Sequence, residues 1–163
     1  MNNAAGIQQT MLTDTQFDHL QQLSRKSRNI EVAQLIRELF TQHEMSEHDR
    51  LIDALDKPAE FKRYVRVGCE TMAASLNTLL SLNDYLVDGT VGTLAHLELI
   101  LALYQYQPNE EARKQLELRI VHQVPASRVA ELTGTSIQHL SRLVSQYNKK
   151  VSVIEEVRQQ FLA

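Results

Sequence analysis

The chain has 163 residues, enough for one or two small domains with a buried core, and a formal net charge of −3. Its single cysteine excludes an intramolecular disulfide and a multi-cysteine zinc site. The negative charge argues mildly against a general nucleic-acid binder. A composition rich in Leu, Gln and Ala, with few Gly and Pro, predicts an all-α helical bundle.

Residues 1–12 are mostly polar and unpatterned, so we predict a disordered tail. They lack the basic and apolar stretches of a signal peptide. The apolar segments further along are too short to span a membrane and are interrupted by polar residues. We therefore expect a soluble, cytoplasmic protein.

Residues 13–88 are predicted to form an N-terminal helical region for oligomerisation or for a protein partner. Apolar residues recur at helical spacing from Thr13 and over residues 30–43. Ser46 is predicted to cap a short helix. Pro58 is predicted to end that helix and to open the next, which Gly68 bends or splits.

Two apolar stripes in this region, at residues 32–40 and 76–86, predict core or an oligomer interface. Cys69 lies in an apolar run and is interpreted as a small core residue. The basic run of Arg25, Lys26 and Arg28 could contact phosphate, but we favour a solvated helix end and loop.

The strongest break in the pattern lies at residues 88–92. It predicts a hinge or domain boundary, although a plain turn between helices fits equally well. After it, residues 93–163 are predicted to form a second, helical region. Helices are expected over residues 94–106 and from an N-cap at Asn109, and an apolar stripe continues the last helix beyond residue 150.

The stretch ASRVAELTGTSIQHLSRLV at residues 126–144 has the spacing of a helix-turn-helix. Val129, Ala130 and Leu132 are placed on one side of its first helix, and Ala130 is small enough to let two backbones cross. Gly134 suits a left-handed residue at the end of that helix. A helical corner that binds nothing would carry the same features, so we weigh both interpretations and favour DNA reading.

Thr135 and Ser136 are N-cap candidates for the second helix, and Leu140, Leu143 and Val144 form its inner face. Its outward residues are of the types that read a major groove or contact phosphate. The predicted DNA-binding residues are Ser136, Ile137, Gln138, Ser141, Arg142, Ser145, Lys149 and Lys150. His139 is interpreted as a solvated helix residue.

Residues 109–150 contain seven Lys and Arg against four Glu, so this part is locally basic on an acidic chain. Residues 61–65 (FKRYV) and 140–144 (LSRLV) are alike in pattern. Two degenerate copies of one helical unit would explain this, and chance similarity between amphipathic helices explains it equally well.

No enzymatic or metal site is predicted. His43 and His48 are five residues apart, not four as in the helical zinc-protease motif, and we find no phosphate-binding glycine loop. We therefore expect neither a catalytic role nor a cofactor.

Residues 97–151 resemble the PapB-type regulators of bacterial adhesin operons and the helix-turn-helix unit of KorA-type plasmid repressors. The resemblance is carried by the helical pair up to His122, by RVAEL at residues 128–132, by LSRL at residues 140–143 and by Asn148. It implies an operator-binding transcription regulator that acts as a dimer or higher oligomer. Family members are shorter, and residues 1–90 have no clear counterpart in them.

Two hypotheses follow from the sequence. The first is a homodimeric, sequence-specific regulator of double-stranded DNA, of bacterial or plasmid type, with a recognition helix at residues 136–147. The alternative is a helical interaction protein that binds another protein through residues 32–40 or 76–86 and does not touch DNA.

Overall fold

The computed structural model describes residues 11–86, 92–104 and 107–161, and every regular element within these ranges is helical. The predicted all-α class is therefore confirmed. The chain divides into two compact units, of which unit 1 comprises Met1–Asn77 with Gln160–Ala163 and unit 2 comprises Thr78–Gln159. None of the described helices combines the length and the apolar content needed to cross a bilayer.

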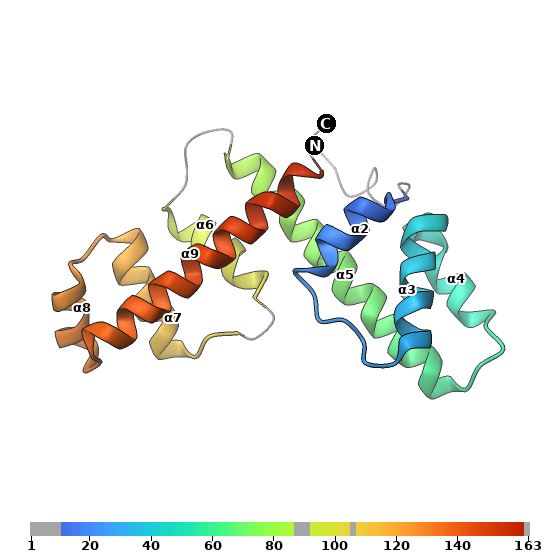
Figure 1. The fold of residues 1–163 in the computed structure, drawn as a ribbon, viewed down its shortest axis with the longest axis horizontal. Coiled ribbons are helices and arrows are strands. Elements are labelled where there is room, and N and C mark those ends of the chain that lie inside the picture. The colour runs from blue at the N-terminus through green and yellow to red at the C-terminus, as the bar shows by residue number, and fades with distance from the viewer. Residues whose placement is uncertain (1–10, 87–91, 105–106, 162–163) are drawn as a thin grey trace. The chain divides into compact units, whose positions relative to one another are not determined.

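Unit 1 is built from short helices around the first part of one long helix (Figure 1). Its elements are α2 (Asp14–Gln21), α3 (Ile30–Gln42), η1 (Met45–Glu47), α4 (His48–Asp53) and the N-terminal part of α5 (Ala59–Leu86). Local sequence sets the starts of two of them. The Thr13 hydroxyl accepts from the Gln16 N–H in a capping box, and the Asn29 carboxamide accepts from the N–H groups of Glu31 and Val32.

Both apolar stripes predicted as core or interface lie mostly inside the chain. Val32, Ile36, Leu39 and Phe40 are buried on α3, and Leu76, Leu79 and Leu82 are buried on α5. The surfaces named for a protein partner are therefore covered by the chain's own helices, and the core interpretation is the one that fits. The side chain of Leu86 lies outside the described residues.

Gly68 is predicted to bend or to split α5, and the split is wrong. The helix α5 continues unbroken from Ala59 to Leu86. The absence of a side chain at Gly68 serves the packing of α5 against Ile36 of α3. A Cβ at Gly68 would overlap Cδ1 of Ile36, so a larger residue there would require the end of the Ile36 side chain to move. The glycine is therefore a contact point between helices.

The predicted cap at Ser46 is also wrong, because Ser46 lies inside η1 and the N-cap residue of α4 makes no side-chain hydrogen bond. The turn of η1 runs directly into α4, and the His48 N–H donates to the Met45 carbonyl. The predicted helix over residues 94–106 ends earlier, at Ala102.

The first ten residues of the predicted tail lie outside the described residues. Its last residue, Leu12, belongs to the core: the side chain is buried and the N–H donates to the Phe40 carbonyl over 2.9 Å. The predicted boundary at residues 88–92 also lies mostly outside them. The two units divide within α5, between Asn77 and Thr78.

Unit 2 holds the remaining helices, and α6, α7 and α8 each contact α9 (Figure 1). After the last part of α5 come α6 (Leu94–Ala102), α7 (Glu110–Leu116), the π-helical η2 (Glu117–Val121), α8 (Ala126–Thr133) and α9 (Ile137–Gln159). The predicted cap at Asn109 is confirmed, since its carboxamide accepts from the Ala112 N–H over 2.8 Å. Ile154 and Val157, in the apolar stripe beyond residue 150, are fully buried.

Candidate nucleic-acid interface

The corner between α8 and α9 has the local geometry that the sequence predicts. Gly134 ends α8 with φ +68° and donates its N–H to the Ala130 carbonyl. The Ser136 hydroxyl accepts from the His139 N–H over 3.1 Å, so Ser136 caps α9. A Cβ at Gly134 would meet nothing within 4 Å. The left-handed conformation, and not the space, therefore requires glycine there.

Val129 and Ala130 are buried on the inner side of α8, as predicted. Leu132 is not, because 55% of its surface is exposed. It lies two residues beyond Ala130, about 200° further around the helix, and so leaves the buried side. Leu132 and the first residue of α9, Ile137, with 53% exposed, place two large apolar side chains in solvent close to the corner.

One face of α9 is polar and open to solvent. Gln138, Ser141, Arg142, Ser145 and Lys149 follow the spacing of a single helix face, and all five are exposed. Neither Arg142 nor Lys149 forms an ion pair with a described carboxylate, so both charges are free to meet an anion. Six of the eight predicted site residues, these five and the cap Ser136, are thus exposed polar groups at the start or on one face of α9.

The apolar residues of α9 explain why this face is turned outward. Leu140, Tyr147 and Ile154 recur every seven residues and are buried. A helix whose one side is held in the core must present its opposite side to solvent. The rotation of the predicted site about the helix axis is therefore set by three core residues.

Lys150 differs from the other predicted contacts. Its side chain is only partly exposed, and the ammonium group lies 5.9 Å from the centre of the Tyr104 ring, a cation–π distance. Burial lowers the pKa of Lys150 from its ordinary value. Lys149 and Lys150 are neighbours in sequence but point about 100° apart on the helix, so only Lys149 shares the open face.

A groove of about 450 Å³ runs along the edge of this face. It is lined by Arg119, Ala126, Leu140, Ser141, Val144, Ser145, Asn148, Lys149 and Ser152. This lining, all of it described, contains two cations, three serine hydroxyls and an amide but no carboxylate. A polyanion such as a phosphate backbone would therefore be attracted by two cations along the groove and could accept hydrogen bonds from its polar side chains. The lining of the groove has no negative charge that would repel it.

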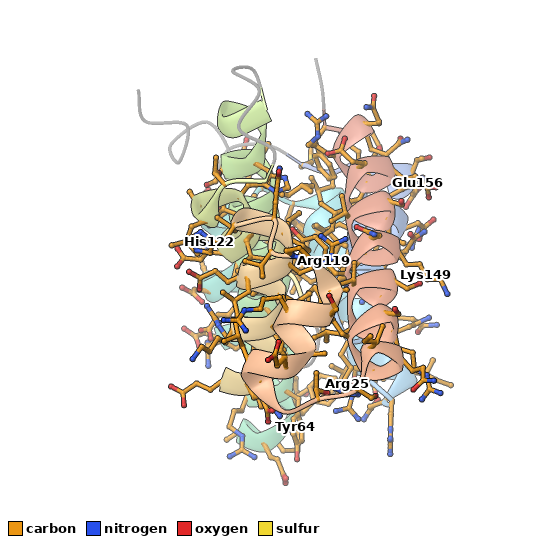
Figure 2. The ribbon with its side chains drawn as sticks, turned by 90° about the vertical axis from the view of Figure 1, so that its left-hand side faces the viewer. Arg25, Tyr64, Arg119, His122, Lys149 and Glu156 are labelled. Carbon is orange, nitrogen blue, oxygen red and sulfur yellow. The ribbon has the colours of Figure 1, made fainter. Side chains whose placement is uncertain are left out.

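Arg119 is the contributor that sequence reasoning missed. It lies in η2, where the His122 N–H donates to the Glu117 carbonyl five residues back. Helical periodicity assumes a bond four residues back, so it misplaces side chains in such a turn. Figure 2 labels Arg119 and Lys149, which come from different elements of unit 2. The only sequence signal was the local excess of basic residues in which Arg119 is counted.

Two other side chains of this region, Arg128 and His122, lie beside carboxylates. Arg128 forms an ion pair with Glu131 over 3.2 Å, one turn along α8. His122 lies 3.4 Å from the Glu117 carboxylate. The Arg128 charge is therefore partly neutralised where it stands, in contrast to those of Arg142 and Lys149.

Two side chains elsewhere in the chain are of types that can bind a metal or act as a nucleophile, but one is hydrogen-bonded to the backbone and the other is buried. His48 donates Nε2–H to the Leu39 carbonyl over 2.7 Å, which leaves that nitrogen unavailable as a metal ligand. Cys69 is buried, and burial raises the pKa of its thiol to about 12, so it stays protonated at neutral pH. Within the described ranges, no three His, Cys, Asp or Glu side chains are grouped as a metal site.

No protein-family model, no curated protein and no solved structure matches this chain.

Proposed function

We propose that this protein is a sequence-specific DNA-binding transcription regulator of bacterial or plasmid type. In this proposal α8 and α9 form a helix-turn-helix, and the N-terminal half of α9 enters the major groove. The observation that carries the proposal is the exposed polar face of α9, on which Gln138, Arg142 and Lys149 are aligned and the two cations are unpaired. The resemblance to PapB-type and KorA-type regulators supports the same assignment.

The residue types on this face match the chemistry of base edges. A guanidinium such as that of Arg142 pairs with the two acceptors of guanine, and a carboxamide such as that of Gln138 pairs with adenine. The exposed Ile137 at the first position of α9 offers an apolar contact for a thymine methyl group. The B-DNA major groove is about 12 Å wide, which admits a helix with its side chains.

The groove beside α9 supplies the backbone contacts of the proposal. Lys149 on α9 and Arg119 on η2 would bind phosphates, while the hydroxyls of Ser141 and Ser145 donate to them. Phosphate contacts fix the position of a protein on the duplex and carry no sequence information directly. The proposal therefore separates a reading set, Gln138 and Arg142, from a positioning set, Arg119 and Lys149.

A regulator of this kind acts where the bacterial chromosome or plasmid lies, so the proposal includes a cytoplasmic location. It also includes a homodimer, because two copies reading half-sites one helical turn apart gain affinity together. The competing protein-interaction hypothesis relied on residues 32–40 and 76–86. The apolar side chains described there are largely buried, so a partner could reach them only after the helices separate.

The test is a selection of random duplex DNA by the purified protein at near-physiological and at higher salt, followed by sequencing. The expected result is an enriched motif with half-sites about one helical turn apart. The variant Arg142→Ala should lose about 1–3 kcal/mol of specific binding and relax the preference at one base pair.

The matched control is Arg113→Ala, which removes the same charge from an exposed residue at the end of α7. It should leave both affinity and sequence preference unchanged. Absence of any enriched motif for the wild-type protein would refute the proposed function. A motif that Arg142→Ala leaves unchanged would remove Arg142 from the reading set.

A further inference from the structure

Unit 1 contains a pocket of about 490 Å³ beside the loop that joins α2 to α3. The loop contributes Arg25, Lys26 and Arg28, and the other walls come from α2, α3 and α5. The lining consists of Gln21, Ser24, Arg25, Lys26, Ser27, Arg28, Ala33, Ile36, Tyr64, Val67, Gly68, Thr71 and Met72. We call it the Arg25–Arg28 pocket. All of its lining is described, and it contains no carboxylate.

The cations of this pocket are unpaired, whereas many others in unit 1 are not. Four arginines and lysines of unit 1 form ion pairs with carboxylates: Arg37 with Asp14 and Asp18, Arg50 with Glu47, Lys57 with Glu31, and Arg66 with Asp49 and Asp53. Within the described chain, Arg25, Lys26 and Arg28 form no ion pair. Three like charges on one short loop repel one another, and an anion between them would relieve that repulsion.

The α5 wall of the pocket carries two exposed side chains, Tyr64 at 51% and Val67 at 54%. The Tyr64 hydroxyl donates to the Glu60 carboxylate over 3.1 Å, and the Arg63 guanidinium lies 5.4 Å from the centre of the Tyr64 ring. Ile36 and Met72 are buried in the lining between the walls. A molecule that filled the pocket would therefore cover apolar surface that otherwise faces water.

The loop is tied to the helices that form the other walls. The Ser24 and Ser75 hydroxyls are hydrogen-bonded over 3.0 Å, and the Gln21 carboxamide donates to the Ser24 carbonyl over 3.0 Å. The backbone N–H groups of residues 25–28 have no partner in the described chain. The start of the loop is thus held in place by α2 and α5. The backbone N–H groups of residues 25–28 remain available to donate to a ligand.

We propose that the Arg25–Arg28 pocket binds a small organic anion. Its carboxylate or phosphate group lies against Arg25, Lys26 and Arg28, and its apolar body lies against Tyr64 and Val67. The pocket volume is in the range of small-molecule sites, and an apolar wall with a few converging polar groups is the common composition of such sites. This inference concerns unit 1 and does not depend on DNA binding by α9.

Titration calorimetry with four probes tests the proposal. Octanoate and octyl phosphate carry the two anionic groups on the same apolar chain, 1-octanol lacks the charge, and inorganic phosphate lacks the apolar body. We expect octanoate or octyl phosphate to bind at least tenfold more tightly than 1-octanol and inorganic phosphate. Which of the two binds better identifies the anionic group.

The double variant Arg25→Gln with Arg28→Gln should weaken that binding at least tenfold. The matched control, Arg50→Gln with Arg113→Gln, removes the same charge from exposed positions outside the pocket and should change nothing. A second variant leaves the loop intact: Val67→Glu places a carboxylate on the exposed helical wall and should weaken binding to a similar degree. Circular dichroism checks that each variant folds.

Three outcomes would overturn the proposal. The first is equal binding of 1-octanol or of inorganic phosphate, and the second is an equal loss in the control variant. The third is a uniform loss of duplex DNA affinity in the double variant while neither amphiphilic anion binds, which would make the loop a phosphate contact for DNA.

Discussion

Gly68 is the residue at which two helices of unit 1 come closest. Its position in the middle of α5 is unfavourable for the helix itself, since glycine costs about 1 kcal/mol relative to alanine in a helix interior. The side chain of Ile36 on α3 occupies the place of the missing Cβ. The close packing of these two helices offsets the cost in helix propensity. The sequence signalled an unusual residue here but could not say whether it served conformation or packing.

Gly68→Ala is therefore expected to lower the free energy of unfolding in the wild-type background, by about 1 kcal/mol after the gain in helix propensity. In an Ile36→Val background, which removes the overlapping Cδ1, the same change should raise it by about 1 kcal/mol. Urea unfolding of the four proteins measures both effects. Equal effects in the two backgrounds would show that the contact with Ile36 does not require the glycine.

His48 is a buried side chain whose protonation is unfavourable in the folded chain. It lies edge-on to the Phe40 ring at 4.7 Å, and burial lowers the pKa of its imidazole below 6.5, partly opposed by the hydrogen bond to Leu39. The unfolded chain thus binds a proton more readily than the folded one. Stability due to this group is present above pH 6.5 and is lost as the pH falls toward the folded pKa.

The variant His48→Gln keeps an N–H donor near the Leu39 carbonyl but cannot titrate. In this variant the free energy of unfolding is expected to decrease less steeply as the pH falls below 6.5. Urea unfolding at a series of pH values measures this slope. Absolute stability is not the readout, because glutamine also loses the contact with Phe40. His96 retains part of the slope, since burial lowers the pKa of its imidazole as well. An unchanged slope would contradict the assignment.

At the scale of elements, the start of α9 combines a structural and a proposed functional role in one residue. Ser136 caps the helix through its hydroxyl and is also the first of the predicted DNA contacts. The two roles can be separated, because an N-cap requires only an acceptor oxygen and also tolerates a negative charge, whereas a DNA contact does not tolerate that charge.

Ser136→Ala is expected to lower the free energy of unfolding by about 1 kcal/mol through loss of the cap. Ser136→Asp should keep the stability close to wild type but weaken duplex DNA binding strongly through repulsion of phosphate. The control is Thr135→Ala, whose side chain makes no hydrogen bond within the described chain and should change neither. Equal DNA affinity of Ser136→Asp and wild type would place this helix end away from the duplex.

At the scale of the molecule, the chain is acidic overall while the proposed interface is basic. Net charge of −3 opposes a general attraction to DNA, so the proposed binding depends on a small number of local cations. Arg119, Arg142 and Lys149 are those cations in the described part of unit 2. The salt dependence of affinity counts such contacts directly, since each neutralised phosphate adds about 0.9 to the slope.

The slope of log affinity against log salt is therefore expected to become shallower by about one in Arg119→Gln and in Lys149→Gln. Lys150→Gln, with the same loss of charge one residue away, should change it much less because the Lys150 ammonium lies over the Tyr104 ring. Fluorescence anisotropy of labelled duplex over a range of salt concentrations measures the slopes. A larger effect from Lys150 than from Lys149 would contradict the assigned rotation of α9.

The sequence by itself determined what depends on neighbouring residues. Helix content, the caps at Thr13, Asn29, Asn109 and Ser136, and the left-handed Gly134 all follow from backbone groups three to five residues apart. The exposed face of α9 was predictable for the same reason, since helical spacing alone places Gln138, Arg142 and Lys149 together. That this face binds DNA stays a prediction.

Only the tertiary structure decided what depends on residues distant in sequence. Gly68 contacts Ile36, the Lys150 ammonium lies over the Tyr104 ring, and Arg119 lines the groove beside α9. The tertiary structure also divided the chain within α5, where the local pattern continues without a break. The physical reason is the same in each case: a local pattern fixes which helix forms, but burial and charge pairing depend on which helix packs against it.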